Sequence, residues 1–437
     1  MSSKVETSQT DQKPQKQTVV VIGLGMVGLS FIEKLLKYDV HKKFKIESFS
    51  EEPRVAYNRV GLTQYFAHRS EENLFMQPPP WYEDHDVTIH LGDKAVRIDR
   101  ENKSVHSSKG LTVSYDYCVI ATGSYAWKPP MPNVNSGGVF VYRTIDDLNE
   151  IISYSANCKK SAVIGGGLLG LEAAKALHDL GLDLTIVEVS PILMPRQLDK
   201  KGAKLLLSEI EKLGINHALG QPPKEVVVGD DGKIKGLSFP DGKFMDLDML
   251  VIAAGIRPRD EIAKNSGIDT HQRGGIFVDD RLQTNDPSIF AIGEVALHGG
   301  MIYGLVAPGY DMADVVAANL VGPASDRKFT GGDLSSKLKL LGVHVASFGD
   351  HFAKDDVAMP LVYKDPFGSV YKKLMFSKDG KHLLGGILVG DTDDYAKLHA
   401  LSRSKKPLSM KPSELILGVK SGQAPGSDDL PDEAQIW

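Results

Sequence analysis

Three glycines near the start of the chain have the spacing G-x-G-x-x-G: Gly23, Gly25 and Gly28, in VVVIGLGMVG. In this pattern the first glycine permits a tight turn, the second lets a pyrophosphate approach the backbone, and the third lets a helix pack closely on a strand. The helix N-terminus then offers free N–H groups and partial positive charge to the phosphates. An acid at the end of the next strand bonds the ribose, and Glu51 and Glu52 are equally placed for this role.

The same spacing recurs in SAVIGGGLLG, where the glycines are Gly165, Gly167 and Gly170. Glu188 follows Gly170 by 18 residues, and an acid there favours a free ribose 2′-hydroxyl over a 2′-phosphate. NADH is therefore expected in preference to NADPH, although Arg196, a few residues further on, could soften that preference. One such motif is a weak signal, but two copies predict two dinucleotides bound by one chain.

The elements around each motif are those that the chemistry requires. TVVVIG and SAVIG read as buried parallel strands, and MVGLSFIEKLLKY has apolar residues at helical spacing. After about residue 330 the pattern changes, and VYKKLMFSKDGKHLLGGILVGD predicts two antiparallel strands around a Lys-Asp-Gly turn. The sequence therefore predicts an α/β fold with two Rossmann-like dinucleotide-binding domains and a smaller α+β domain at the C-terminal end.

Composition excludes several other classes of protein. The net charge is −5 and no block of Lys or Arg is present, which disfavours a nucleic-acid partner. No run of about 18 apolar residues or secretory signal occurs, so we expect a cytoplasmic protein without a membrane span. The two cysteines, Cys118 and Cys158, lie 40 residues apart, too few for a four-thiolate cluster. Cys118, in the apolar stretch YDYCVIATG, is expected to be buried and inert, and no metal site is predicted.

Several motifs together resemble a known family. GLGMVG, ATGS, GGGLLGLEAA, AAGIRPRD and TNDPSIFAIGE are similar to motifs of the FAD-dependent pyridine nucleotide-disulfide oxidoreductase superfamily. Within it, EEPRVAYNRV, YRTIDDL, QLDKKGAKLL, GLVAPGYDMA, LSSKLKLLGV and GGILVGDT resemble the N-terminal flavoprotein module of the assimilatory nitrite reductase large subunit, over about residues 18–435. The resemblance implies an enzyme that passes hydride from NADH, or NADPH, to FAD and electrons to an external acceptor in nitrate assimilation.

The same resemblance divides the chain into domains. It implies a disordered tail (1–17), an FAD-binding domain (18–145 and 270–330), an NAD(P)H-binding domain (146–269), a C-terminal interface domain (331–420) and a second tail (421–437). The interface domain would offer a surface for a homodimer or for a docked partner.

The resemblance also assigns site residues. Glu172 is a candidate catalytic residue near the nicotinamide, with a helix-packing acid as the open alternative. Glu294 resembles the acid that holds the ribityl chain, where the wider superfamily usually has Asp. The implied cofactor-binding residues are Gly23, Gly25, Gly28, Glu51, Glu52, Arg59, Val96, Ala121, Thr122, Gly123, Arg143, Gly165, Gly167, Leu168, Leu169, Gly170, Glu188, Arg196, Gly255, Gly293, Glu294, Ala307 and Gly309.

The electron acceptor follows from what the chain lacks. Many members of the superfamily carry an active cysteine near the FAD, but no cysteine occurs between Ala56 and Phe66. Electrons should therefore leave directly to a partner, such as an Fe–S or sirohaem protein. Because the iron–sulfur and sirohaem parts of the full reductase are not in this sequence, nitrite reduction by this chain alone is not expected. The alternatives are a ferredoxin or rubredoxin reductase and a flavin-binding protein like apoptosis-inducing factor.

Overall fold

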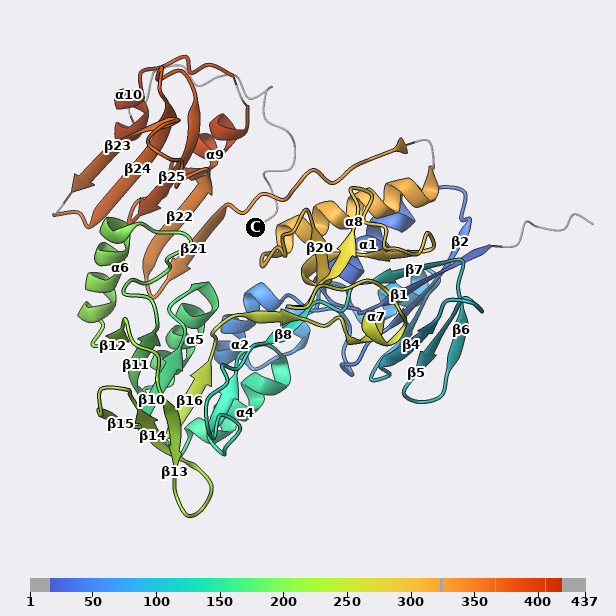
Figure 1. Ribbon diagram of the computed structural model, residues 1–437, viewed down its shortest axis with the longest axis horizontal. Coiled ribbons are helices and arrows are strands. Elements are labelled where there is room, and N and C mark those ends of the chain that lie inside the picture. The colour runs from blue at the N-terminus through green and yellow to red at the C-terminus, as the bar shows by residue number, and fades with distance from the viewer. Residues whose placement is uncertain (1–15, 323–324, 366, 405, 419–437) are drawn as a thin grey trace, which may run out of the picture. The chain divides into compact units, whose positions relative to one another are not determined.

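The computed structural model describes residues 16–322, 325–365, 367–404 and 406–418 (Figure 1). Most of the tail predicted over 1–17, and all of the tail predicted over 421–437, lie outside the described residues. The chain forms two compact units. The first unit takes in the described parts of 1–127, 143–152 and 255–333, and the second those of 128–142, 153–254 and 334–437.

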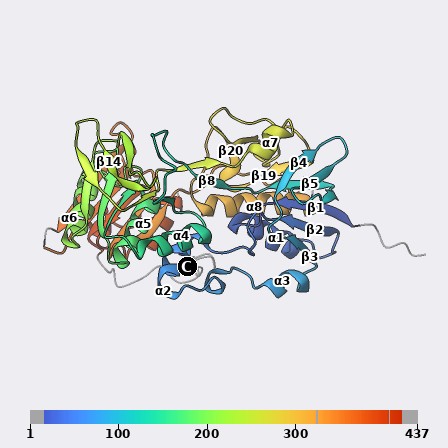
Figure 2. The ribbon, with the colours of Figure 1, turned by 90° about the horizontal axis from the view of Figure 1, so that it is seen from below.

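A five-stranded parallel sheet is the centre of the first unit, in the order β3-β2-β1-β7-β19. Its strands are β1 (Gln17–Ile22), β2 (Phe44–Phe49), β3 (Val87–His90), β7 (Tyr117–Ile120) and β19 (Ile289–Ala291). The side chains of Val19, Val20 and Val21 are fully buried, as expected for a strand covered on both faces. Helix α8 (Val306–Val321) lies beside α1 (Met26–Tyr38) in both views (Figures 1 and 2).

Smaller elements complete the first unit. β4 (Ala95–Asp99), β5 (Ser104–Ser107) and β6 (Thr112–Ser114) form an antiparallel sheet, while β8 (Ser124–Ala126) pairs with β17 (Ile256–Pro258) and β18 (Ile276–Val278) with β20 (Ala296–His298). The helices are α2 (Leu62–His68), α3 (Pro79–Asp84) and α7 (Glu261–Asn265), with 3-10 turns η1 (Arg59–Gly61), η2 (Glu72–Leu74) and η3 (Gly293–Val295). Helix α4 (Ile145–Ser155) begins in the first unit and ends in the second.

The second unit has its own parallel sheet, in the order β12-β11-β10-β16-β9. The strands are β9 (Val139–Val141), β10 (Lys160–Ile164), β11 (Asp183–Glu188), β12 (Asn216–Leu219) and β16 (Met249–Ile252), and the helices are α5 (Leu168–Asp179) and α6 (Lys200–Lys212). An antiparallel sheet of β13 (Glu225–Val228), β14 (Ile234–Ser238) and β15 (Phe244–Asp246) accompanies it.

An antiparallel sheet, here called the C-terminal sheet, completes the second unit in the order β21-β22-β25-β24-β23. Its elements are β21 (Ser336–Leu340), β22 (Val343–Gly349), β23 (Ala358–Asp365), β24 (Val370–Ser377) and β25 (Leu383–Val389), followed by α9 (Tyr395–Ser404) and α10 (Pro412–Leu417). The predicted hairpin around Lys-Asp-Gly is confirmed, because β24 and β25 pair antiparallel. Two parallel sheets and a smaller α+β part confirm the predicted fold class.

Candidate dinucleotide sites

The first glycine motif forms the turn between β1 and α1. Gly23 has φ +110°, and a Cβ on it would lie 2.4 Å from the Ala121 oxygen. A Cβ on Gly28 would lie 2.0 Å from the Gly23 oxygen, so both residues must be glycine for the fold itself. Gly25 caps the helix without a side-chain hydrogen bond, and a Cβ there would meet nothing within 4 Å. The turn therefore leaves room for a ligand beside the N-terminus of the helix.

The second motif repeats this geometry between β10 and α5. Gly165 has φ +125°, and a Cβ on it would lie 2.4 Å from the Ala253 oxygen. A Cβ on Gly170 would lie 1.9 Å from the Gly165 oxygen, whereas one on Gly167 would meet nothing within 4 Å. Leu168 and Leu169 begin α5, so backbone N–H groups of its first turn are unpaired within the helix. Both turns fit the pyrophosphate of a dinucleotide.

Glu188 ends β11 and lies against the second glycine turn. Its Oε2 accepts a hydrogen bond from the Gly166 N–H at 2.6 Å, and its Oε1 accepts one from the Ser190 N–H at 2.7 Å. These bonds fix the carboxylate at the carboxyl end of the strand, the place from which an acid bonds the adenosine ribose of a dinucleotide.

The counterpart of Glu188 in the first unit is a serine. In the second unit the carbonyl that accepts the N–H of the motif's first glycine belongs to Val187, one residue before Glu188. In the first unit it belongs to Phe49, and the next residue is Ser50. The spacing counted from Gly28 singled out Glu51 and Glu52, and Ser50 is apparent only from the hydrogen bond between the glycine turn and the neighbouring strand.

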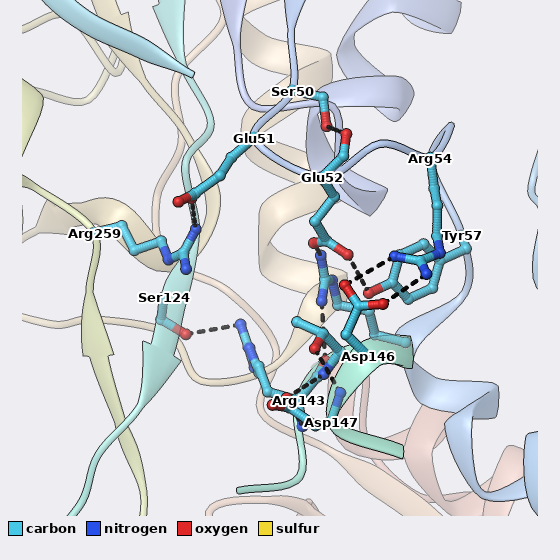
Figure 3. Close-up of polar contacts among 12 residues, drawn as sticks. Ser50, Glu51, Glu52, Arg54, Tyr57, Ser124, Arg143, Asp146, Asp147 and Arg259 are labelled. Atoms are coloured by element: carbon cyan, nitrogen blue, oxygen red, sulfur yellow. Dashed lines mark hydrogen bonds and ion pairs between the residues drawn. The ribbon is translucent and has the colours of Figure 1, made fainter. Parts of the chain in front are cut away.

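The two acids left open by the sequence point to different partners (Figure 3). Glu51 pairs with Arg259 at 2.5 Å and with Lys94 at 3.2 Å. Burial opposes ionisation of Glu51, but these two cations hold its pKa below the usual value. Glu52 pairs with Arg59. In this structure both carboxylates are thus engaged by cations from other segments of the first unit.

Arg59 is fixed on three sides. Its guanidinium pairs with Glu52, donates to the Arg143 oxygen at 2.9 Å and lies 4.6 Å from the centre of the Tyr57 ring. The Tyr57 hydroxyl donates to the other oxygen of Glu52 at 2.7 Å. Tyr57 was not among the site residues predicted from the sequence. Burial raises its pKa, so this hydroxyl stays a hydrogen-bond donor.

A second cluster joins residues far apart in the sequence. Arg143 Nη2 donates to Ser124 Oγ at 2.8 Å and to Glu294 Oε2 at 2.6 Å. Ser124 Oγ donates to the same carboxylate oxygen at 2.7 Å. Glu294 follows Gly293, whose φ is +77°. The structure thus brings Arg143 and Glu294 together, as well as Ser124, which sequence reasoning missed.

A crossover ties three segments of the first unit together. After β7, the Thr122 hydroxyl donates to the Arg259 oxygen at 2.6 Å, and the Arg259 N–H donates to the Gly123 oxygen at 2.9 Å. The Gly255 oxygen accepts from the Trp127 N–H at 2.9 Å. Ala121 lies under the first glycine turn, as the Gly23 contact shows.

The remaining predicted FAD-side residues lie on α8 and β4. Ala307 is exposed in the first turn of α8. A Cβ on Gly309 would lie 2.5 Å from Val27 Cγ2, so glycine allows α8 to approach α1. Val96, on β4, is 41% exposed. On the nicotinamide side, Arg196 is exposed in the loop between β11 and α6.

Glu172 lies in the second turn of α5, in the same helix that starts at the second glycine turn. Burial raises the pKa of its carboxyl to about 7. No ion pair to Glu172 exists within the described parts of the chain. The group is therefore poised to change its charge near neutral pH, a property shared by many acids and bases in catalysis.

Cysteine and metal chemistry are not apparent in the described residues. Cys118 is buried, as expected, and burial raises the pKa of its thiol. Among residues 16–418, apart from the gaps given above, no group of three His, Cys, Asp or Glu side chains could hold a metal ion. No helix in the same ranges is both long and apolar enough to cross a membrane.

Two known families match successive parts of the chain. Residues 17–316 match the family described as pyridine nucleotide-disulphide oxidoreductase, and residues 335–406 match the rubredoxin NAD+ reductase C-terminal domain. The chain is 45% identical to the NADH nitrite reductase large subunit of Escherichia coli K12, over 96% of this chain and 50% of that protein. It is 34% identical to the assimilatory nitrate reductase electron transfer subunit of Bacillus subtilis, over 97% of this chain and 53% of that protein. The chain spans about half the length of these curated relatives.

Solved structures share the fold. A ferredoxin reductase from Rhodopseudomonas palustris is similar with a TM-score of 0.82 and 24% identity, over 92% of this chain and 97% of that chain. NADH:rubredoxin oxidoreductase from Clostridium acetobutylicum has a TM-score of 0.73 and 24% identity, over 92% and 100%. The matches confirm the predicted oxidoreductase class with its flavin and nicotinamide cofactors. This chain belongs to the pyridine nucleotide-disulphide oxidoreductase family.

Proposed function

We propose that this chain is the flavoprotein electron-input component of a nitrite- or nitrate-reductase-type system, oxidising NADH and passing electrons to an external acceptor. The observation that carries the proposal is the pair of matched glycine turns. In each, the central glycine, Gly25 or Gly167, leaves open space at a helix N-terminus. The 45% identity to an NADH nitrite reductase large subunit indicates the system to which such a two-nucleotide enzyme belongs.

One set of residues would bind FAD, and a second set would bind NADH. FAD, when bound, accepts hydride from reduced nicotinamide and releases electrons onward. The first glycine turn and Arg59 would bind its phosphates, and the Ser124–Arg143–Glu294 cluster would orient its ribityl chain. The second turn and Glu188 would bind NADH, with Glu172 holding or releasing a proton at the nicotinamide end. The division into FAD-binding (18–145, 270–330), NAD(P)H-binding (146–269) and interface (331–420) domains is part of the proposal.

The acceptor is proposed to be a separate Fe–S or sirohaem protein. The stretch from Ala56 to Phe66 holds no cysteine that could relay electrons, so a direct exit from the flavin is the simplest route. The relative from Bacillus subtilis is named an electron transfer subunit, which supports this division of labour. A second candidate, a ferredoxin or rubredoxin reductase, is favoured by the match of residues 335–406 to a rubredoxin reductase domain.

A spectral experiment tests the proposal. The purified protein, supplemented with FAD, is expected to be yellow and to bleach within seconds of anaerobic mixing with NADH. It should then reduce ferricyanide but not nitrite. A colourless protein that takes up no FAD, or a yellow one that NADH leaves oxidised, would refute the enzyme assignment.

The identity of the electron acceptor distinguishes the two candidate functions. The reduced protein is mixed with rubredoxin, with ferredoxin and with a sirohaem Fe–S protein, and the reoxidation of the flavin is followed at 450 nm. Fast reoxidation by the sirohaem protein supports the proposed function. Fast reoxidation by rubredoxin or ferredoxin alone favours the second candidate.

A further inference from the structure

The loop of residues 189–199, between β11 and α6, is anchored to the second glycine turn. The Met194 N–H donates to the Gly166 oxygen at 2.9 Å, and the Ser190 N–H donates to Glu188 at 2.7 Å. The side chain of Leu193, within this loop, is buried against the glycine turn. A Cβ on Gly166 would lie 2.7 Å from it. This loop follows the ribose acid directly, where a dinucleotide's adenosine end would lie.

The same loop is also held by the C-terminal sheet. His351 follows β22, and its Nε2 lies 3.1 Å from the Arg196 oxygen while its Nδ1 lies 3.1 Å from the Gly349 oxygen. Both neighbours are carbonyl oxygens and can only accept, so the Nε2–H form of the ring donates to the Arg196 oxygen. The ring also lies against Phe352, with centroids 4.5 Å apart. Arg196 is thus fixed through its backbone, while its side chain stays exposed.

A second contact holds the end of the loop where α6 begins. Asp199 Oδ1 caps the helix by accepting from the Gly202 N–H at 2.9 Å. Asp199 Oδ2 accepts from the Tyr371 hydroxyl at 2.7 Å and lies 3.6 Å from Lys373 Nζ, both on β24. A Cβ on Gly202 would lie 3.3 Å from the Tyr371 ring, so the helix and the strand are in close contact (Figure 1).

We propose that the C-terminal sheet positions the loop of residues 189–199 for the adenosine end of the nicotinamide nucleotide, with His351 as the positioning residue that holds Arg196. The inference rests on the proposed function and adds a determinant of nucleotide choice to it. Glu188 at one end of the loop repels a ribose 2′-phosphate. Arg196 forms no ion pair within the described part of the chain, which leaves its guanidinium for such a phosphate. His351 therefore affects the balance between NADPH and NADH.

Equilibrium binding tests the inference without turnover. FAD-loaded protein is titrated calorimetrically with ADP-ribose and with 2′-phospho-ADP-ribose. In His351→Ala the affinity for the phosphorylated probe is expected to fall about 3- to 10-fold, the range for one lost hydrogen bond. The affinity for ADP-ribose is expected to change less than about 2-fold, within the scatter of a distant substitution. His351→Gln, whose amide can still donate to the Arg196 oxygen, should recover most of the loss.

Two further variants exclude a general structural effect. His344→Ala removes an exposed histidine from β22 of the same sheet and should change neither affinity. In an Arg196→Ala background, His351→Ala should no longer change the ratio of the two affinities, because the group that it positions is gone. This double-mutant comparison remains informative even where His351→Ala lowers the melting temperature.

The outcomes separate the inference from the proposed function. A wild-type protein that binds neither probe contradicts the proposed function itself. A wild-type protein that binds both, with a ratio unchanged in His351→Ala or changed equally in the Arg196→Ala background, overturns the inference and leaves the function standing.

Discussion

Arg143 and Glu294 lie 151 positions apart in the sequence, yet the guanidinium of one donates to the carboxylate of the other at 2.6 Å. Each side chain is only 20% exposed, so the pair is largely removed from water. Ser124 bonds both partners, and a third segment of chain thereby joins the same cluster. The pair holds the segment just before α4 against the segment that contains η3, within the first unit.

Removing one partner of this pair should therefore cost stability. Arg143→Ala leaves the Glu294 carboxylate half-buried without its cation, and we expect the free energy of unfolding to fall by about 1 to 3 kcal/mol. Urea denaturation measures the change. Arg281→Ala, which breaks a pair with Asp326 that is exposed on both sides (37% and 61%), is the matched control and should change the free energy by less than about 1 kcal/mol. Equal losses in both variants would show that the cluster carries no special share of stability.

The two central glycines should have separable effects. Gly25 has φ −98° and Gly167 φ −87°, which any residue adopts, so valine at either position leaves the fold intact. Gly25→Val should weaken FAD binding by more than about tenfold, and Gly167→Val should retain FAD but lose its reduction by NADH. Flavin fluorescence and anaerobic bleaching measure the two properties. If Gly167→Val instead loses FAD, the assignment of the two sites is reversed.

Gly23→Ala is the contrasting variant at the same turn. Its Cβ would lie 2.4 Å from the Ala121 oxygen, and φ is +110°, so the backbone itself must move. We expect a loss of stability even without FAD, seen as a lower melting temperature of the apoprotein. An apoprotein that melts like the wild type would mean that the turn is more adaptable than its geometry indicates.

The sequence predicts local backbone features well. Gly23 and Gly165 mark tight turns because a positive φ and a nearby carbonyl leave no space for a Cβ, and this requirement is readable from a short motif. The acid expected to bind the ribose is harder to choose, because Glu51 and Glu52 are adjacent in the sequence and differ in the direction of their side chains. The structure engages both with cations, and Ser50 occupies the position in the first unit that Glu188 occupies in the second.

Contacts between distant segments are what sequence reasoning could not supply. Ser124 joins Arg143 and Glu294 because β8 follows the crossover and η3 follows β19, and neither segment has a periodicity that reveals its neighbour. His351 meets the Arg196 oxygen for the same reason: the contact depends on how α6 packs against β24. Such pairs follow from tertiary packing, which motif spacing does not encode.

Glu172 gives a pH dependence with a defined sign. Burial raises its pKa from 4.5 to about 7, so the folded protein binds this proton more tightly than the unfolded chain does. The contribution of Glu172 to the free energy of unfolding is fully present below about pH 4.5 and is lost as pH rises through about 7. Glu172→Gln cannot ionise, and above pH 7 it should be more stable than the wild type by about 1 to 3 kcal/mol.

Melting curves between pH 4 and 9 measure this difference. Glu150→Gln removes an exposed carboxylate from α4 and should follow the wild-type curve throughout. Parallel curves for the wild type and Glu172→Gln would show that Glu172 is solvated in solution. If Glu172 acts on the nicotinamide, the rate of flavin reduction by NADH should also show a pH step near 7 that Glu172→Gln lacks.

Glu188 should govern the preference for NADH. Its carboxylate accepts two backbone hydrogen bonds, from Gly166 at 2.6 Å and Ser190 at 2.7 Å, so it braces the glycine turn, and the proposed function gives it a second role at the ribose. Glu188→Ala removes the charge that repels a 2′-phosphate and should lower the ratio of kcat/KM for NADH over NADPH by about 10- to 150-fold, the range for hydrogen bonds to a charged group. Glu188→Gln keeps one acceptor oxygen for the backbone but no charge. Its ratio should fall as well, while its melting temperature stays closer to the wild type than that of Glu188→Ala. A ratio that is unchanged in both variants would remove Glu188 from the ribose site and leave it a purely structural brace of the glycine turn.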